Sequence, residues 1–260
     1  NDYDYENAPK KRYGYPSIGV PGVVKGLTKA LSEHGTMQRN DVMAPAIQIA
    51  EDGHSLIFGE AMRQAYVNEQ LNEFEGTRQH FLNSDGSSRQ PGQWVKQKDL
   101  AKVLKAIAEE GSDVFYKGWI AEKIVEDNIA NGGVLSLKAL EEYEALDAEI
   151  VKGNYRDNEL IGLWMPSYGA ITIEALQILE AYKNKLSNNQ EWGESVYHAI
   201  ERAYLDRREQ NTLEDAKRFT SKEWAKKRAA EIHNEQTYIQ WDDLPESFTA
   251  AMGHTTHLTV

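Results

Sequence analysis

The sequence predicts an α+β protein that is rich in helices and has a few strands. Apolar residues recur at helical spacing along most of the 260 residues, most clearly over 99–111. Two short runs rich in strand-forming residues, Glu149–Gly153 and Leu160–Pro166, predict a pair of strands around a turn at 154–158. A third run, Thr255–Val260, alternates in polarity and predicts a strand at the end of the chain.

The first half of the chain is predicted to be mainly helical. Helical spacing begins at Val23 and stops at Gly35. Pro45 lies inside a second apolar run, and because proline lacks a backbone N–H and clashes with the preceding turn, this helix is expected to begin near Pro45. A third helix is expected over 55–74, and a polar loop over 76–92.

The clearest helix carries its own start and stop signals. Asp99 is a good N-cap, the apolar residues that follow form one stripe, and Gly111 can close the C-terminal end. Further helices are expected over 115–132, from Ser136 onward, and over 171–182, 191–208 and 221–232.

Composition excludes several classes of function. The formal net charge is −12, with 41 acidic against 29 basic residues, and such a surface repels nucleic-acid phosphates and anionic membranes. Cysteine is absent, which excludes disulfides, thiol nucleophiles and thiolate metal sites. No apolar run approaches the roughly 18 residues that a membrane span needs. The chain begins without methionine and ends inside a predicted strand, so it is interpreted as a fragment.

Thr255 is the candidate nucleophile. A threonine hydroxyl reacts poorly unless a base takes its proton. If the bond between His254 and Thr255 is cut, the new α-amine, with a pKa of about 7.7–8.0, can act as that base. One residue then supplies both nucleophile and base. From the residues alone an ordinary threonine-rich strand remains the alternative, because strands favour threonine.

Other constellations give no site. His254 and His257 are three residues apart, which places them on opposite faces of a strand, and no third ligand is evident, so no metal is predicted. The paired glutamates at 109–110 and 141–142 are interpreted as solvated helix faces. The glycines near residue 19 lack dinucleotide spacing, and no cofactor is predicted.

The end of the chain resembles a known family. Thr255–Val260, T-T-H-L-T-V, is similar to the T-T-H-L-S-V that opens the small subunit of the γ-glutamyltransferase family. Further blocks match that family in the same order, and together they cover nearly the whole chain: Ser17–Leu27, Pro45–Gly53, Asp99–Ala121, Pro166–Gly169, Ile178–Glu180 and Ala203–Arg207.

The resemblance implies an N-terminal-nucleophile hydrolase with an αββα sandwich, here incomplete. It implies self-cleavage between His254 and Thr255, with Thr255 as nucleophile. Residues 1–254 would be most of the large subunit and 255–260 the first strand of the small subunit, in one composite domain truncated at both ends. The partner would be the protein's own small subunit, and the family's second threonine and oxyanion-hole glycines would lie beyond Val260.

Tyr5 departs from the family pattern. The family's R-E-x-A-P segment supplies an arginine that binds the substrate α-carboxylate, and the matching segment here begins with Tyr5. A tyrosine gives one neutral hydrogen bond, whereas an arginine gives a bidentate charged pair. Lys10 and Arg12 lie nearby in sequence, but the match gives them no such role. Tyr5 is therefore a candidate substrate-binding residue, and a tyrosine at this position argues against specificity for γ-glutamyl groups.

The resemblance implies an amidohydrolase or acyltransferase that cleaves γ-glutamyl amides such as glutathione and passes the acyl group to water or an amine. Two alternatives stay open: a family amidase or acylase for a non-glutamyl amide, and a catalytically silent binding relative. The resemblance suggests a periplasmic or secreted location and leaves the cytoplasm open.

Overall fold

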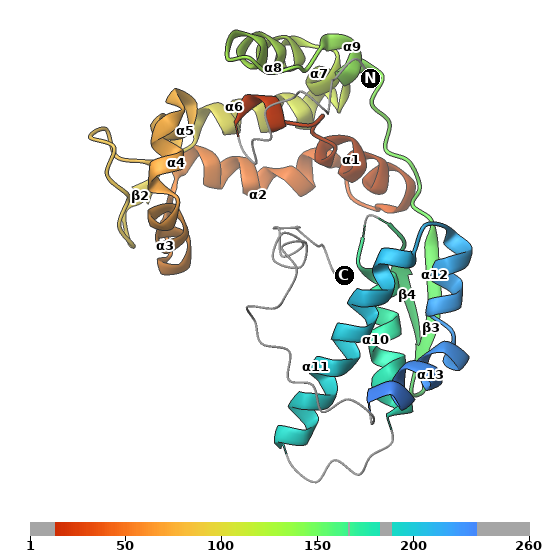
Figure 1. Cartoon of the computed structure of the whole chain (residues 1–260). Coiled ribbons are helices and arrows are strands. Elements are labelled where there is room, and N and C mark those ends of the chain that lie inside the picture. Colours follow the sequence, from red (N-terminus) through yellow and green to blue (C-terminus); the bar gives the residue numbers. More distant parts are fainter. Residues whose placement is uncertain (1–13, 166, 183–188, 233–260) are drawn as a thin grey trace. The chain divides into compact units, whose positions relative to one another are not determined.

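The computed structural model describes residues 14–165, 167–182 and 189–232 (Figure 1). Contacts within the chain divide it into two compact units, residues Asn1–Leu146 and Asp147–Val260. This division lies close to Glu149, where predicted helices give way to the predicted strand pair. The proposed subunit boundary between residues 254 and 255 lies outside the described residues.

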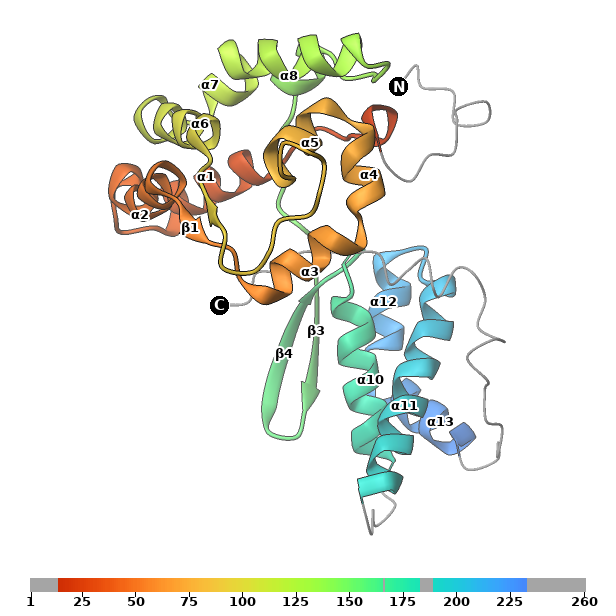
Figure 2. The same cartoon turned by 90° about the vertical axis from the view of Figure 1, so that its left-hand side faces the viewer.

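Unit 1 is built almost entirely from helices. Helix α2 packs along α6, and the short strands β1 and β2 pair antiparallel beside them (Figures 1 and 2). Its elements in chain order are the 3-10 turn η1 (Tyr15–Ser17), α1 (Val23–His34), α2 (Arg39–Asp52), β1 (His54–Ser55), α3 (Phe58–Tyr66), α4 (Asn68–Glu73), α5 (Glu75–Phe81), β2 (Trp94–Val95), α6 (Lys98–Glu110), α7 (Asp113–Tyr116), α8 (Trp119–Ala130) and α9 (Leu137–Glu141).

Tyr116 joins the start of α1 to α7 in the core of unit 1. Its side chain is 1% exposed and its ring stacks on Tyr143, with centroids 5.8 Å apart. The phenol donates a hydrogen bond to the carbonyl of Pro21 (2.6 Å) and accepts one from the backbone N–H of Lys25 (3.0 Å). The glycine- and proline-rich block before α1 is thereby fixed by one buried hydroxyl.

Unit 2 is a hairpin covered by helices. Helix α10 lies against the hairpin, and α11, α12 and α13 pack on α10 (Figure 2). Its elements are β3 (Ile150–Tyr155), β4 (Asn158–Leu163), α10 (Gly169–Ala181), α11 (Asn189–Asp206), the 3-10 turn η2 (Arg207–Glu209), α12 (Leu213–Phe219) and α13 (Lys222–Ile232). The predicted α+β class, rich in helices, is confirmed.

The predicted strand pair is also confirmed. Strands β3 and β4 are antiparallel, and the register runs from Ile150 opposite Leu163 to Tyr155 opposite Asn158. The turn is shorter than expected, with only Arg156 and Asp157 between the strands, and Arg156 adopts a positive φ of 53°. On β3, the buried Val151 packs with residues of α10 and α12, so one face of the hairpin forms core.

Two helix starts were predicted wrongly. Helix α2 begins at Arg39 and contains Pro45 in its interior. The proline removes one backbone donor, a cost of about 3 kcal/mol in a helix interior, but α2 packs along α6 and the helix persists. Helix α6 has Gln97 as its N-cap, so Asp99 lies in the first turn, where its charge favours the helix N-terminus.

The single helix expected over 55–74 was also wrong, because this segment is divided. Ser55 pairs with Trp94 in the small sheet, and α3 ends at Tyr66 before α4 and α5. The side-chain amides of Asn68 and Asn72 donate to the carbonyl of Gly86, at 3.1 and 3.0 Å. These bonds hold α4 against the loop that follows α5, and tertiary contacts of this kind override helical spacing.

Gly162 is expected to be indispensable for the packing of the hairpin on α10. A Cβ at Gly162 would lie 2.8 Å from the Cα of Gly169, a backbone atom that cannot swing away. Gly162→Ala is therefore expected to lower the free energy of unfolding by about 1–3 kcal/mol. Gly193→Ala, on an exposed turn of α11 where no described atom lies within 4 Å, should be neutral or stabilising. Equal urea midpoints for the two variants would contradict the close approach.

Candidate functional site

The predicted site residues Thr255, His254 and Tyr5 lie outside the described residues, as does the predicted strand 255–260. The structure therefore neither brings them together nor separates them. Within the described residues, polar and titratable side chains gather in a buried cluster in unit 2 and around a polar cavity in unit 1.

The buried cluster joins three helices of unit 2. We call it the carboxyl cluster, and it consists of Glu174, Asp206, Trp224 and Arg228. Glu174 lies on α10 and is fully buried, at 0% exposure, and Asp206 at the end of α11 is 4% exposed. Trp224 and Arg228, one turn apart on α13, complete it.

One tryptophan N–H faces both carboxyl groups of the cluster. The indole nitrogen of Trp224 lies 3.0 Å from Oε1 of Glu174 and 2.7 Å from Oδ2 of Asp206. Arg228 donates to Asp206 twice, from Nε to Oδ2 at 2.9 Å and from Nη2 to Oδ1 at 2.5 Å. Arg228 also forms an ion pair with Glu231. Among the described residues, Asp206 therefore receives several donors, whereas Glu174 receives only the indole N–H.

Burial sets the protonation of Glu174. Removal of the side chain from water raises its pKa to about 10, and the neighbouring Asp206 adds to the increase. The indole of Trp224 and the charge of Arg228 act in the opposite direction but are weaker. Glu174 consequently holds its proton at neutral pH, when an exposed glutamate is ionised.

An apolar cavity of about 340 Å³ lies between α10 and α11. Tyr168 and Tyr204 are at one end, with ring centroids 5.9 Å apart, and the guanidinium of Arg207 lies 4.6 Å from the Tyr168 ring. None of the described residues that line this cavity carries a carboxyl group, so its lining suits apolar contact rather than acid–base chemistry. Its lining is Tyr168, Ile171, Thr172, Ala175, Leu176, Leu179, Val196, Ala199, Ile200 and Tyr204.

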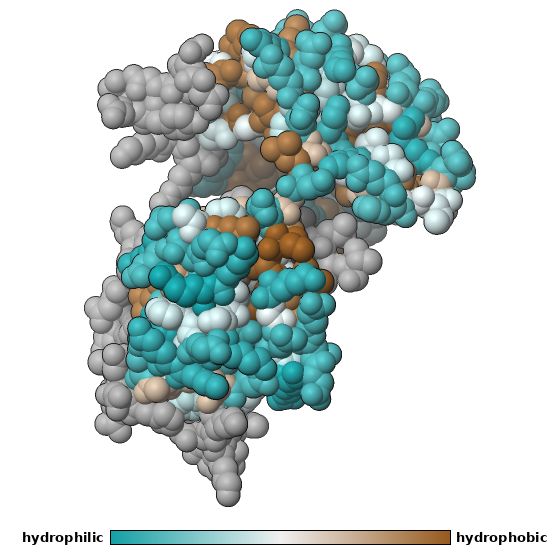
Figure 3. Space-filling model, turned by 90° about the vertical axis from the view of Figure 1, so that its right-hand side faces the viewer, coloured by the Kyte–Doolittle hydropathy of each residue, from teal (hydrophilic) through white to brown (hydrophobic). Residues whose placement is uncertain are grey.

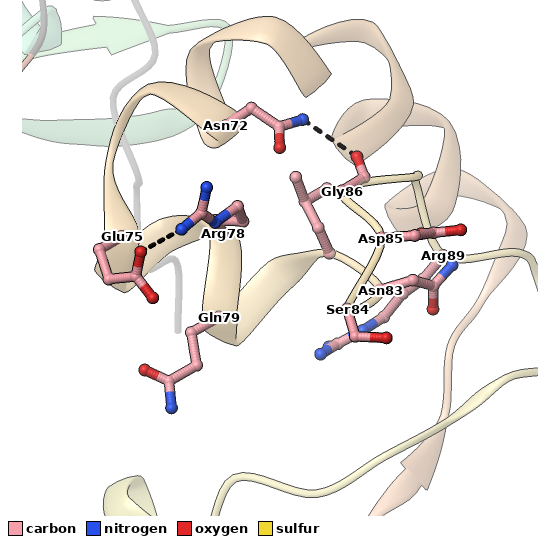
Figure 4. A pocket seen from close by; sticks show the side chains of 10 residues that line it. Asn72, Glu75, Arg78, Gln79, Asn83, Ser84, Asp85, Gly86 and Arg89 are labelled. Atoms are coloured by element: carbon pink, nitrogen blue, oxygen red, sulfur yellow. Dashed lines mark hydrogen bonds and ion pairs between the residues drawn. The ribbon is translucent and has the colours of Figure 1, made fainter.

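A larger cavity of about 840 Å³, in unit 1, is polar (Figure 4). It lies between α4, α5 and the loop after α5, and Arg78 forms an ion pair with Glu75 at its wall. Asp85 accepts a hydrogen bond from the backbone N–H of Ser87 (2.9 Å), and its bonds to Ser87 lower its pKa. With Arg89, the lining carries two positive and two negative side chains, so the cavity favours neither sign of ligand charge.

Metal ligands do not cluster in the described ranges: no group of three or more His, Asp or Glu side chains there could hold a metal ion. Within the same ranges, none of the helices combines the length and apolar character that crossing a membrane requires. Hydrophilic residues cover most of the face shown in Figure 3, with hydrophobic residues in small groups.

The carboxyl cluster was not predicted from the sequence. Helix α10 is apolar on nearly all sides, with Ala170, Ile171, Ile173 and Ile178 buried, and such a helix belongs in a protein interior. A glutamate inside that helix was therefore a readable signal of a buried carboxyl group. Its partners were not readable, because Asp206 and Trp224 are distant in sequence and their meeting depends on the packing of three helices.

The chain is similar to known proteins over most of its length. The sequence model of the family described as gamma-glutamyltranspeptidase matches residues 1–260. A glutathione hydrolase proenzyme of Pseudomonas sp. (strain A14) is 34% identical over 202 residues, which are 75% of this chain and 34% of that protein. An acylase ACY 1 proenzyme of Pseudomonas sp. (strain SE83) is 32% identical over 176 residues, 65% of this chain and 30% of that protein.

A solved structure shares the fold. The crystal structure of Helicobacter pylori gamma-glutamyltranspeptidase aligns with a TM-score of 0.78 and 28% identity, covering 85% of this chain and 66% of that one. The chain spans about a third of the length of the curated relatives it matches.

Proposed function

Because this chain belongs to the gamma-glutamyltranspeptidase family of N-terminal-nucleophile hydrolases, we propose that it is part of an autoprocessing threonine amidohydrolase or acyltransferase. The observation that carries the proposal is a family match over the whole of 1–260, which includes Thr255–Val260, the segment similar to the start of the family's small subunit. Relatives named as proenzymes support a processing step.

The chemistry follows from a terminal amino alcohol. After the bond between His254 and Thr255 is cut, the α-amine of Thr255 accepts the hydroxyl proton as the oxygen attacks the substrate amide carbonyl. The amine then returns the proton to the leaving amine, and a covalent acyl ester remains on Thr255. Water or an acceptor amine attacks this ester, which releases the acyl group and restores the hydroxyl. A pKa of about 7.7–8.0 for an α-amine suits both transfers near neutral pH.

We assign residues 1–254 to the large-subunit part and 255–260 to the first strand of the small-subunit part. The outer face of the hairpin supports this assignment. Ile150, Ile161 and Leu163 lie on it and are 48%, 61% and 48% exposed. A two-stranded hairpin is only marginally stable alone. These three residues form the apolar part of the face, which also carries the exposed ion pair of Lys152 and Glu159. We expect the apolar part to pack against the rest of a sandwich.

γ-Glutamyl amides such as glutathione are the proposed substrates, because relatives at 34% identity are named glutathione hydrolases. A second candidate is an acylase or amidase for a non-glutamyl amide. Two observations favour it: Tyr5 stands where the family's carboxylate-binding arginine is expected, and an acylase is among the relatives. The small-molecule amide and the acceptor amine or water would be the reaction partners, with the small subunit as the protein partner.

Mass spectrometry of the purified gene product tests the proposal. The expected result is two polypeptides, one beginning at Thr255, together with amide hydrolysis in the cleaved sample. An intact junction in an active sample would contradict the proposed mechanism. The coding sequence after Val260 separates an enzyme from a silent binding relative, since only the enzyme needs a second threonine and a glycine pair there.

Tyr5→Arg is expected to change specificity rather than chemistry. An arginine at this position would restore a bidentate charged pair to a substrate α-carboxylate, worth roughly 1.5–3 kcal/mol per charged hydrogen bond. KM for a γ-glutamyl anilide should therefore fall by about tenfold or more, while turnover of an anilide without the carboxylate stays constant. Tyr5→Phe is the matched control. An equal change for both substrates would assign Tyr5 no role in carboxylate binding.

A further inference from the structure

The carboxyl cluster has one hydrogen-bond donor too few. Oε2 of Glu174 is buried and receives no donor from the part of the chain that the structure describes, since the indole N–H of Trp224 faces Oε1. If both acids were ionised, their two negative charges would face the positive charge of Arg228, which also forms an ion pair with Glu231. A buried carboxylate oxygen without a donor, beside a second carboxylate, is strongly unfavourable.

One proton removes both difficulties. A protonated Glu174 becomes a donor, so its O–H can bond to Asp206 while its other oxygen still accepts from Trp224. Asp206 is the better site for the negative charge, because Arg228 donates to both of its oxygens. We propose that Glu174 and Asp206 share one proton at neutral pH, and that this shared proton fastens α13 to α10 and α11, so that unit 2 loosens when alkaline solution removes it.

Three neighbouring helices place further charged groups around the carboxyl cluster. On α11 the buried Arg202 lies one turn before Asp206. On α13 Glu231 holds one side of Arg228, and Lys227 lies 4.6 Å from the Trp224 ring. On α12 Arg218 lies 5.6 Å from the same ring. Among the described residues, the hydrogen bonds of the two carboxyl groups run within the cluster.

The proton gives stability a defined pH dependence. The pKa of Glu174 is raised from 4.5 to about 10 in the folded chain. Within that interval the folded state binds one proton more than the unfolded state, so stability falls as pH rises. The contribution is complete below the unfolded pKa and is lost as pH rises through the folded pKa. Each pH unit between them lowers the folding equilibrium constant by up to tenfold.

Glu174→Gln tests the shared proton in the full-length protein. The glutamine amide replaces the O–H with an N–H that never ionises, so the variant mimics the protonated acid. Both proteins are unfolded with urea at several pH values between 5 and 9.5. As pH rises, the wild type is expected to lose stability relative to the variant. The folding equilibrium constant of the wild type should fall by up to about tenfold per pH unit. Glu223→Gln, at an exposed position of α13, should follow the wild type. Parallel curves for wild type and Glu174→Gln would overturn the proposal.

A spectroscopic measurement keeps the proposal testable if the variant does not fold. Infrared spectra of the folded wild type at neutral pH should contain the carbonyl band of one protonated carboxylic acid, at a pH where exposed carboxyl groups are ionised. The band should shift on labelling with ¹³C-glutamate and vanish in alkaline solution. Absence of that band at neutral pH would equally overturn the shared proton.

Discussion

Thr255→Ala is expected to leave a single uncut polypeptide and to lower amide turnover by about 10⁴-fold or more. Alanine removes the attacking hydroxyl from both the processing step and the catalytic step, and without cleavage no α-amine is released to act as base. Gel electrophoresis of the purified protein measures the first effect, and hydrolysis of a γ-glutamyl anilide measures the second.

Thr255→Ser is the conservative comparison. Serine keeps the hydroxyl and, once cleaved, the terminal amine, so the variant should still process and turn over, though more slowly. If Thr255→Ala were cleaved before residue 255, or if it kept wild-type turnover, the nucleophile would have to lie elsewhere. The proton shared by Glu174 and Asp206 is independent of that result, because it is measured by unfolding and infrared spectra.

Asp206→Ala is expected to destabilise unit 2 by about 3 kcal/mol. The substitution removes two hydrogen bonds from Arg228 and one from Trp224, and it leaves the half-buried guanidinium with Glu231 as its remaining ion-pair partner. Breaking a buried pair generally costs about 3–5 kcal/mol. The lower end is expected here because Glu174, also close to Arg228, can ionise and replace part of the lost charge. Chemical unfolding monitored by tryptophan fluorescence measures the change.

An exposed ion pair provides the control for Asp206→Ala. Glu126 pairs with Lys123 at 2.6 Å on α8, and both side chains are exposed. Solvent screens such pairs, and many contribute nothing measurable. Glu126→Ala should therefore leave the unfolding midpoint unchanged. If Asp206→Ala also left the unfolding midpoint unchanged, the carboxyl cluster would not be what holds α13 in place.

Local chemistry made part of the fold predictable. The β3–β4 hairpin was predicted because strand-forming residues flank a turn, and α10 and α13 because their apolar residues repeat at helical spacing. Gly111 closes α6 with a φ of +94°, as expected of a C-terminal glycine. These features depend on residues close together in sequence.

Long-range packing decided the features that were predicted wrongly or missed. Pro45 remains inside α2 because α6 lies along that helix, and the amides of Asn68 and Asn72 bind the loop at Gly86. Glu174 meets Asp206 and Trp224 across 32 and 50 positions of sequence, which no local pattern encodes. The proposed nucleophile Thr255, in contrast, was identified from a contiguous sequence motif. It lies outside the described residues.

The contact between Gly162 and Gly169 has a practical consequence for directed evolution. At that contact backbone packs on backbone. A Cβ at Gly162 would lie 2.8 Å from the Cα of Gly169, and a Cβ at Gly169 would lie closer still to the carbonyl oxygen of Leu163. No side chain is therefore present there whose substitution could adjust the contact. Mutant libraries for this protein should hold both glycines constant and place their diversity at exposed helix positions such as 193 and 223.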